Sequence, residues 1–91
     1  MKKKLDYKIK EGYDFNNLKQ YGFSKTQPKE NPWWQYPIQI DWSTGLGFYK
    51  ESININNKTN EVYLVWEETI SQFKHQDVID KLLGDNALIK L

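Results

Sequence analysis

The chain contains no cysteine, no arginine, one histidine and one alanine among its 91 residues. Without cysteine it can form no disulfide, no thiolate nucleophile and no cysteine-ligated zinc site. The single imidazole, His75, has no second histidine to share a metal ion with, so we expect no metal and no cofactor. No apolar run approaches the roughly 20 residues that span a bilayer. These absences predict a small cytoplasmic protein that does not bind membranes.

The missing arginine also bears on nucleic acids. All thirteen basic residues are lysine, and lysine cannot reproduce the planar fork with which guanidinium reads phosphate and guanine. Sequence-specific DNA reading is therefore disfavoured.

Charge is unevenly distributed along the chain, although the net charge is only +1. Residues 1–30 carry eight lysines against four acidic residues, whereas residues 31–91 carry five lysines against eight. This asymmetry can steer an anionic partner to the N-terminal part, although a solvated lysine-rich end is the simpler interpretation. The candidate anion-facing residues are Lys2, Lys3, Lys4, Lys8 and Lys10.

Three runs of alternating apolar residues lie between Trp33 and Trp66, a segment that holds all four tryptophans. The alternation predicts strands at 34–42, 49–55 and 61–67, joined by turn-forming clusters into an antiparallel meander. The run at 61–67 is apolar on both faces and is expected to be the central strand. Pro37 cannot donate to a ladder, so either the first strand lies at an edge or its regular part begins after Pro37.

Two helices are predicted on either side of the meander. Residues 15–21 have apolar side chains spaced by three, with Asp14 as N-cap and Gly22 as the terminating residue. Residues 77–83 form a second apolar stripe, which ends before Gly84.

The remaining segments are open to more than one interpretation. Residues 69–76 can begin the second helix or form a loop, and residues 24–32 are a proline-containing loop. The segment 1–13 can be an edge strand or a mobile arm, and 87–91 can add an edge strand. We therefore predict one α+β domain spanning residues 1–91, with an antiparallel meander sheet of three to five strands, a short N-terminal helix and a C-terminal helix packed on one face.

The adjacent tryptophans Trp33 and Trp34 must face opposite sides of an extended strand. The alternation assigns Trp34 to the core, together with Ile40, Trp42 and Trp66. Trp33 then either folds over the core as a lid or is exposed, where it could anchor a protein partner, a sugar ring or an unstacked base. The candidate partner-binding residues are Trp33, Tyr36 and Tyr63.

Candidate catalytic groups are sparse. A nucleophilic site would need His75 beside a serine or threonine, and no local signature supports one. Asp41 and Glu51 could approach one another across neighbouring strands, and two carboxylates about 5 Å apart can hydrolyse a glycoside. Because solvent-facing sheet residues explain both carboxylates equally well, we predict no catalytic residue and no enzymatic activity.

Two segments carry a resemblance. The sequences DFNNLKQYGF at 14–23 and DVIDKLL at 77–83, on either side of the aromatic meander, resemble small uncharacterised α+β proteins of low-GC Gram-positive bacteria and their phages. The abundance of lysine, asparagine and isoleucine agrees with such a source. The resemblance implies a similar fold and a phage or mobile-element setting, and it supplies no functional residues.

Three functional hypotheses result. The favoured one is a non-enzymatic accessory protein that binds a protein partner or itself through an aromatic patch. The second is a weak, sequence-independent nucleic-acid binder, in which the N-terminal lysines contact phosphates and aromatic residues stack on bases. A small hydrolase is the third and the least supported.

Overall fold

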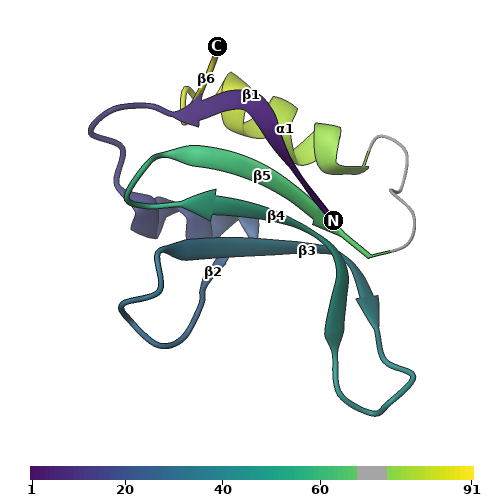
Figure 1. Ribbon diagram of the computed structural model, residues 1–91. Coiled ribbons are helices and arrows are strands. Elements are labelled where there is room, and N and C mark those ends of the chain that lie inside the picture. Colours follow the sequence, from purple (N-terminus) through teal and green to yellow (C-terminus); the bar gives the residue numbers. More distant parts are fainter. Residues whose placement is uncertain (68–73) are drawn as a thin grey trace.

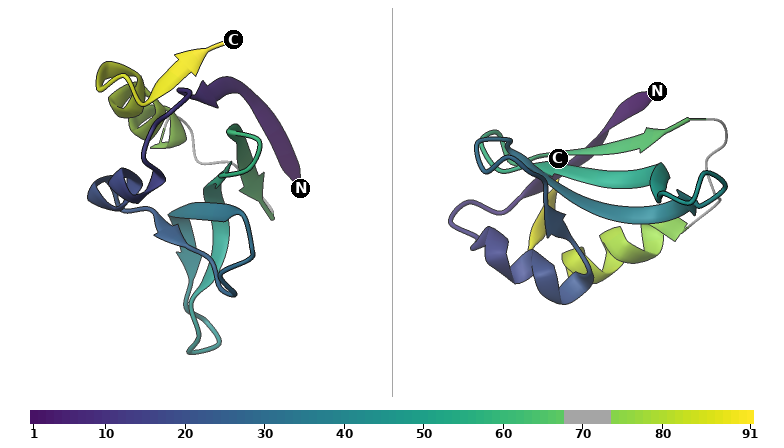
Figure 2. Two further views of the ribbon diagram at one scale, coloured as in Figure 1. Left: turned by 90° about the vertical axis from the view of Figure 1, so that its left-hand side faces the viewer. Right: turned by 90° about the horizontal axis from the view of Figure 1, so that it is seen from below.

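A curled antiparallel sheet of six strands, shaped like a half-barrel, dominates the protein (Figures 1 and 2). The computed structural model describes residues 1–67 and 74–91. In space the strands follow the order β2-β3-β4-β5-β1-β6. They are β1 (Lys2–Ile9), β2 (Ser24–Lys25), β3 (Trp33–Asp41), β4 (Phe48–Asn56), β5 (Glu61–Trp66) and β6 (Leu88–Lys90).

The predicted α+β fold, with three to five strands and two helices, is wrong, because the protein is mainly β. Both terminal segments join the sheet, and β2 arises within the predicted loop. The segment Phe15–Tyr21 (η1) is a 3-10 helix, which leaves α1 (Lys74–Gly84) as the one α-helix of the described residues. The N-terminal strand lies inside the sheet because Leu5 and Ile9 are buried in the core, which a charged alternating segment does not suggest by itself.

The predicted boundaries of η1 are confirmed. The Asp14 carboxylate accepts a hydrogen bond from the backbone amide of Asn16 at 2.9 Å, and Gly22 ends the helix with φ of 100°. The hydroxyl of Tyr21 donates to Asp85 at 2.6 Å, just after α1, and this bond raises the pKa of Tyr21 to about 12. Two turns cannot persist alone in water, so η1 depends on such contacts.

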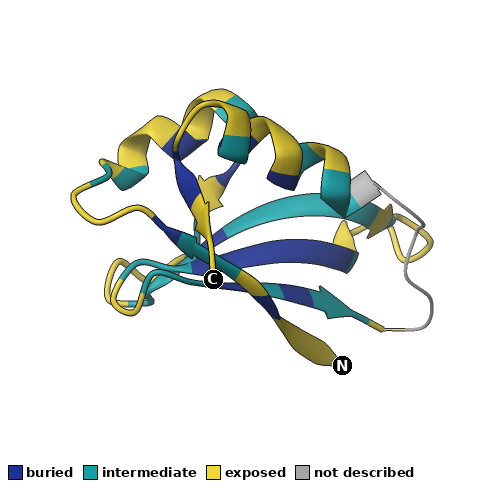
Figure 3. Ribbon diagram, turned by 90° about the horizontal axis from the view of Figure 1, so that it is seen from above, coloured by how far each residue is buried: buried dark blue, intermediate teal, exposed yellow. Residues whose placement is uncertain are grey.

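Both helices cover the same face of the sheet (Figure 2, right). Beneath them the strands carry most of the buried positions (Figure 3). The predicted second helix begins earlier than expected, at Lys74, and part of the ambiguous segment 69–76 lies outside the described residues. The core between this face and the two helices includes Leu5, Ile9, Leu18, Trp34, Ile53, Ile55, Val62, Leu64, Ile79 and Leu82.

The strand β5 lies between β4 and β1, which confirms its prediction as an interior strand. Pro37 lies in the part of β3 that β2 does not cover, since β2 pairs only with Trp34 and Gln35. No helix in the described residues has the length and apolarity that a membrane crossing requires.

The pairing of β3 with β4 is regular only as far as Pro37. The register shifts between Pro37 and Gln39 and again between Gln39 and Ile40. After the first shift, Gln39 lies opposite Glu51, and its amide donates to that carboxylate at 2.7 Å. In an unbroken strand, Gln39 would face away from the core side that Glu51 shares with Ile53.

These shifts overturn the assignment of Ile40 and Trp42 to the core. Both side chains are exposed, Trp42 to 65% of its surface. The other two assignments are confirmed, because Trp34 is buried and Trp66 packs against the core while partly exposed.

Candidate binding site on the helix-free face

The face of the sheet opposite η1 and α1, here called the helix-free face, carries the side chains that alternate with the core residues. Neighbouring strands align Gln35, Asn54, Tyr63 and Lys4 in one row across β3, β4, β5 and β1. The row therefore combines two amides, an aromatic ring and a cation on one surface.

Two aromatic residues meet above this row. The rings of Trp33 on β3 and Tyr63 on β5 are 5.5 Å apart between centroids and meet edge to face at 75°. They reach one another across β4, where the asparagine side chain of Asn54 is short. Such aromatic pairs contribute roughly 0.5 to 1.5 kcal/mol beyond the area that they bury.

A cavity of about 210 Å³, here called the sheet pocket, lies beside this pair. Ligand sites for drug-sized molecules occupy roughly 300 to 1,000 Å³, so the sheet pocket has room for one ring or one side chain. The ammonium group of Lys2 lies 5.4 Å from the Tyr63 ring centroid, within reach of a cation–π interaction. The lining residues are Lys2, Trp33, Gln35, Asn54, Tyr63 and Val65.

The ladder holds Lys2 in place. The amino group of Met1 donates to the backbone carbonyl of Trp66 at 2.8 Å, and the Trp66 amide donates back to Met1 at 2.9 Å. The strand is thus paired up to its first residue, which fixes the backbone from which the Lys2 side chain extends.

A buried polar pair lies in the middle of the helix-free face. Asn54 and Ser52 are both buried, and the Asn54 amide donates to the Ser52 hydroxyl at 2.9 Å. A buried amide without a partner costs roughly 1 to 3 kcal/mol, so this bond stabilises a polar residue in the middle of the sheet. Asn54 and the half-buried Gln35 bring amide donors and acceptors to the sheet pocket.

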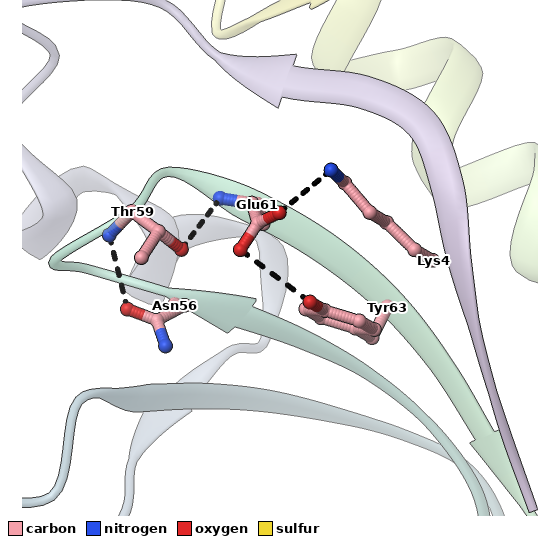
Figure 4. Close-up of polar contacts among 5 residues, drawn as sticks. All are labelled: Lys4, Asn56, Thr59, Glu61 and Tyr63. Carbon is pink, nitrogen blue, oxygen red and sulfur yellow. Dashed lines mark hydrogen bonds and ion pairs between the residues drawn. The ribbon is translucent and has the colours of Figure 1, made fainter.

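Glu61 connects Lys4 to Tyr63 (Figure 4). Its carboxylate lies 2.7 Å from the Lys4 ammonium and accepts a hydrogen bond from the Tyr63 hydroxyl at 3.4 Å. The hydrogen bond with Lys4 lowers the pKa of the Glu61 carboxyl, and the same bond raises the pKa of Lys4. The ion pair with Glu61 therefore engages Lys4, while Lys2 is the cation at the pocket.

The remaining predicted anion-facing lysines are more dispersed. Lys8 is half-buried and lies opposite Glu61 in the register, further along the same strand. Lys3 lies opposite Leu64, whose side chain is in the core, so strand alternation directs Lys3 away from the helix-free face. Lys10 follows the end of β1.

The three predicted partner-binding aromatics do not share a surface. Trp33 and Tyr63 line the same cavity, but Tyr36 packs against the core on the opposite face. Its ring lies 5.4 Å from that of Phe23 and in contact with the position where Gly22 would carry a Cβ.

The groups considered for hydrolysis have separate structural contacts. Asp41 accepts the backbone amide of Ser43 at 2.9 Å, and this hydrogen bond lowers the pKa of the Asp41 carboxyl. Glu51 is fully buried and accepts a hydrogen bond from the side-chain amide of Gln39. His75 is partly buried and lies in the first turn of α1. Among the described residues, no cluster of three or more His, Cys, Asp or Glu side chains could hold a metal ion.

The sequence interpretation missed the two amides of the sheet pocket. Gln35 and Asn54 occupy polar positions of their strands, and only the strand register shows that they are neighbours. The alternation of Asn54 with Ile53 and Ile55 was the available signal, because it directs Asn54 to the face that Trp33 occupies.

Comparisons with protein-family models, with curated proteins and with solved structures found no match to this chain. The resemblance to phage and low-GC bacterial proteins stays a prediction.

Proposed function

We propose that this chain is a non-enzymatic binding protein whose helix-free face holds single-stranded nucleic acid without reading its sequence. The observation that carries the proposal is the contact between a cation and an aromatic pair: Lys2 lies 5.4 Å from the Tyr63 ring, which in turn lies 5.5 Å from Trp33. Single-strand binders combine cations that follow the phosphates with aromatic rings on which bases stack.

The size of the sheet pocket and the two amides in its mainly apolar lining support one base as the occupant. A cavity of about 210 Å³ has room for a single heterocycle. Gln35 and Asn54 offer amides that can donate to or accept from a base edge. A single hydrogen bond from or to such an amide can be made with several base edges, and a chain without arginine lacks the usual reader of guanine.

This assignment departs from the favoured sequence hypothesis for a geometric reason. A protein-binding patch was expected to unite Trp33, Tyr36 and Tyr63, and Tyr36 lies on the other face. The nucleic-acid hypothesis needed lysines beside aromatic rings, and Lys2 lines the same cavity as Trp33 and Tyr63.

The proposal is tested by fluorescence anisotropy with a labelled oligothymidylate of about ten nucleotides, within the usual site size. The affinity is expected to fall between about 50 and 200 mM salt, and Lys2→Gln to reduce the slope of log affinity against log salt by about 0.7. Trp33→Ala is expected to weaken binding by about 1 to 3 kcal/mol, or roughly 5- to 150-fold.

Two matched variants serve as controls. Lys90→Gln removes an exposed lysine on β6, and Trp42→Ala removes an exposed tryptophan outside the site. Both should leave the affinity unchanged, and circular dichroism should show that all four variants are folded. The proposal fails if no binding occurs at low salt, if Trp33→Ala behaves like Trp42→Ala, or if decaglutamate competes as well as the oligonucleotide.

A further inference from the structure

A second exposed surface lies on the β3–β4 hairpin, which extends beyond the rest of the sheet (Figure 1; Figure 2, left). Residues 42–49 at its end carry no charge. Trp42, Leu46 and Phe48 are exposed to 65%, 67% and 52% of their surfaces. We call the exposed apolar side chains of this hairpin the hairpin patch; they are Ile40, Trp42, Leu46, Phe48 and Tyr49.

At the centre of the hairpin patch the Trp42 ring packs against the backbone of Gly47. A Cβ added to Gly47 would lie 2.8 Å from the Trp42 ring and 3.3 Å from the Ile40 side chain, so the indole lies directly over the glycine. Ile40 is paired with Tyr49 in the register. The hairpin thus presents the Trp42 indole close to Ile40, which is in turn paired with Tyr49.

The exposed apolar area of the patch is on the order of 500 Å², within the roughly 300 to 600 Å² of the largest apolar patch on a monomer, which is often a functional surface. A stable interface buries about 800 Å² on each partner, so the patch supplies most of what a dimer needs. We propose that the hairpin patch is a self-association surface and that its occupant is the hairpin patch of a second copy.

Charge and symmetry favour a second copy. A two-fold contact places the same patch on both sides, and no charge between residues 42 and 49 would meet its like across the axis. The net charge of +1 causes little long-range repulsion between two chains. An anionic lipid surface fits less well, because Asp41 and Lys50 adjoin the patch with opposite charges and leave it without a net positive charge.

Sedimentation equilibrium over a wide concentration range tests the proposal. The wild-type chain is expected to dimerise, and the double variant Trp42→Ser with Phe48→Ser to weaken association at least tenfold. Ile89→Ser, which removes an exposed apolar side chain on β6, is the control and should leave association unchanged.

A second variant tests the geometry without removing an apolar group. Gly47→Ala should displace the Trp42 indole and weaken association, whereas Gly84→Ala, with no atom within 4 Å of the new methyl group, should not. Near-ultraviolet circular dichroism and thermal unfolding establish that each variant is folded.

The proposal is overturned if the wild-type chain stays monomeric at all concentrations. Binding of the monomer to phosphatidylcholine vesicles would then assign the hairpin patch to lipid and would not rescue the proposal. It is also overturned if the double variant associates normally or if Ile89→Ser breaks the dimer. Nucleic-acid binding is independent of these outcomes, because Lys2, Trp33 and Tyr63 lie outside the hairpin patch.

Discussion

The two halves of β3 have the same sequence pattern and different surroundings. From Trp33 to Pro37 the strand is in regular register with β4, one side packs into the core and the other lines the sheet pocket. Beyond Pro37 the register shifts twice, and Ile40 and Trp42 are exposed. Alternation thus specifies a buried face only as long as the register holds, and a bulge divides one amphipathic run into two surfaces.

The largest expected contrast between the two halves is in stability. Ile53, opposite Tyr36 in the regular half, is fully buried, so Ile53→Ala should lower the free energy of unfolding by about 2 to 5 kcal/mol. Trp42→Ala removes a larger but exposed side chain and should change the free energy of unfolding by no more than about 0.5 kcal/mol. Urea unfolding of dilute protein measures both, and similar losses would mean that the hairpin belongs to the core.

A smaller contrast comes from two glycines, one packed against each half. Gly22 has φ of 100°, and a Cβ there would lie 3.0 Å from the Tyr36 ring, so Gly22→Ala should cost about 1 to 3 kcal/mol. Gly47→Ala meets the Trp42 ring and the Ile40 side chain, both of which are exposed and can move, and should cost less than about 1 kcal/mol.

Gly84→Ala is the matched control for both glycine variants, because it introduces the same methyl group into open space. Thermal unfolding ranks the three variants. If Gly47→Ala were the most destabilising of the three, the Trp42 indole would have to be held rigidly in place. That result would contradict the description of the hairpin patch as exposed.

The smallest expected effect concerns two carboxyl groups with lowered pKa values, Glu61 at the start of β5 and Asp41 at the end of β3. The pKa of Glu61 is lowered chiefly by its hydrogen bond with the Lys4 side chain, and that of Asp41 by the backbone amide of Ser43. Lys4→Met should therefore raise the pKa of Glu61 towards its ordinary value and leave that of Asp41 unchanged.

Both lowered values imply the same sign of pH dependence. The ionised forms stabilise the folded state above the ordinary values of 4.5 and 3.8, and this stabilisation is lost as pH falls through the folded pKa values. Carbon-detected NMR titration reports each carboxyl group separately. Equal responses of the two groups to Lys4→Met would show that Lys4 does not act through Glu61.

Local signals predicted local features of this fold well. The N-cap at Asp14, the glycine that ends η1 at Gly22 and the apolar character of β5 on both faces each depend on residues close in sequence. The assignment of Trp33 and Trp34 to opposite faces of the sheet was likewise predictable, because adjacent residues of a strand point to opposite sides.

Non-local pairing accounts for what the sequence did not show. The two residues of β2 form a strand only because β3 lies beside them, and β1 becomes an interior strand because β5 and β6 flank it. The sheet pocket needs the register of four strands, which no single run contains. The bulge after Pro37 also depends on how β3 and β4 are aligned, and so the exposure of Trp42 was missed.

The separation of the helix-free face from the hairpin patch is tested most directly by fluorine NMR on protein labelled with 5-fluorotryptophan, with the four signals assigned by Trp→Phe variants. Adding oligothymidylate should shift the Trp33 signal and leave that of Trp42 in place, whereas diluting the free protein should shift Trp42 and leave Trp33. A Trp33 signal that ignores the oligonucleotide, or two signals that always move together, would contradict the account.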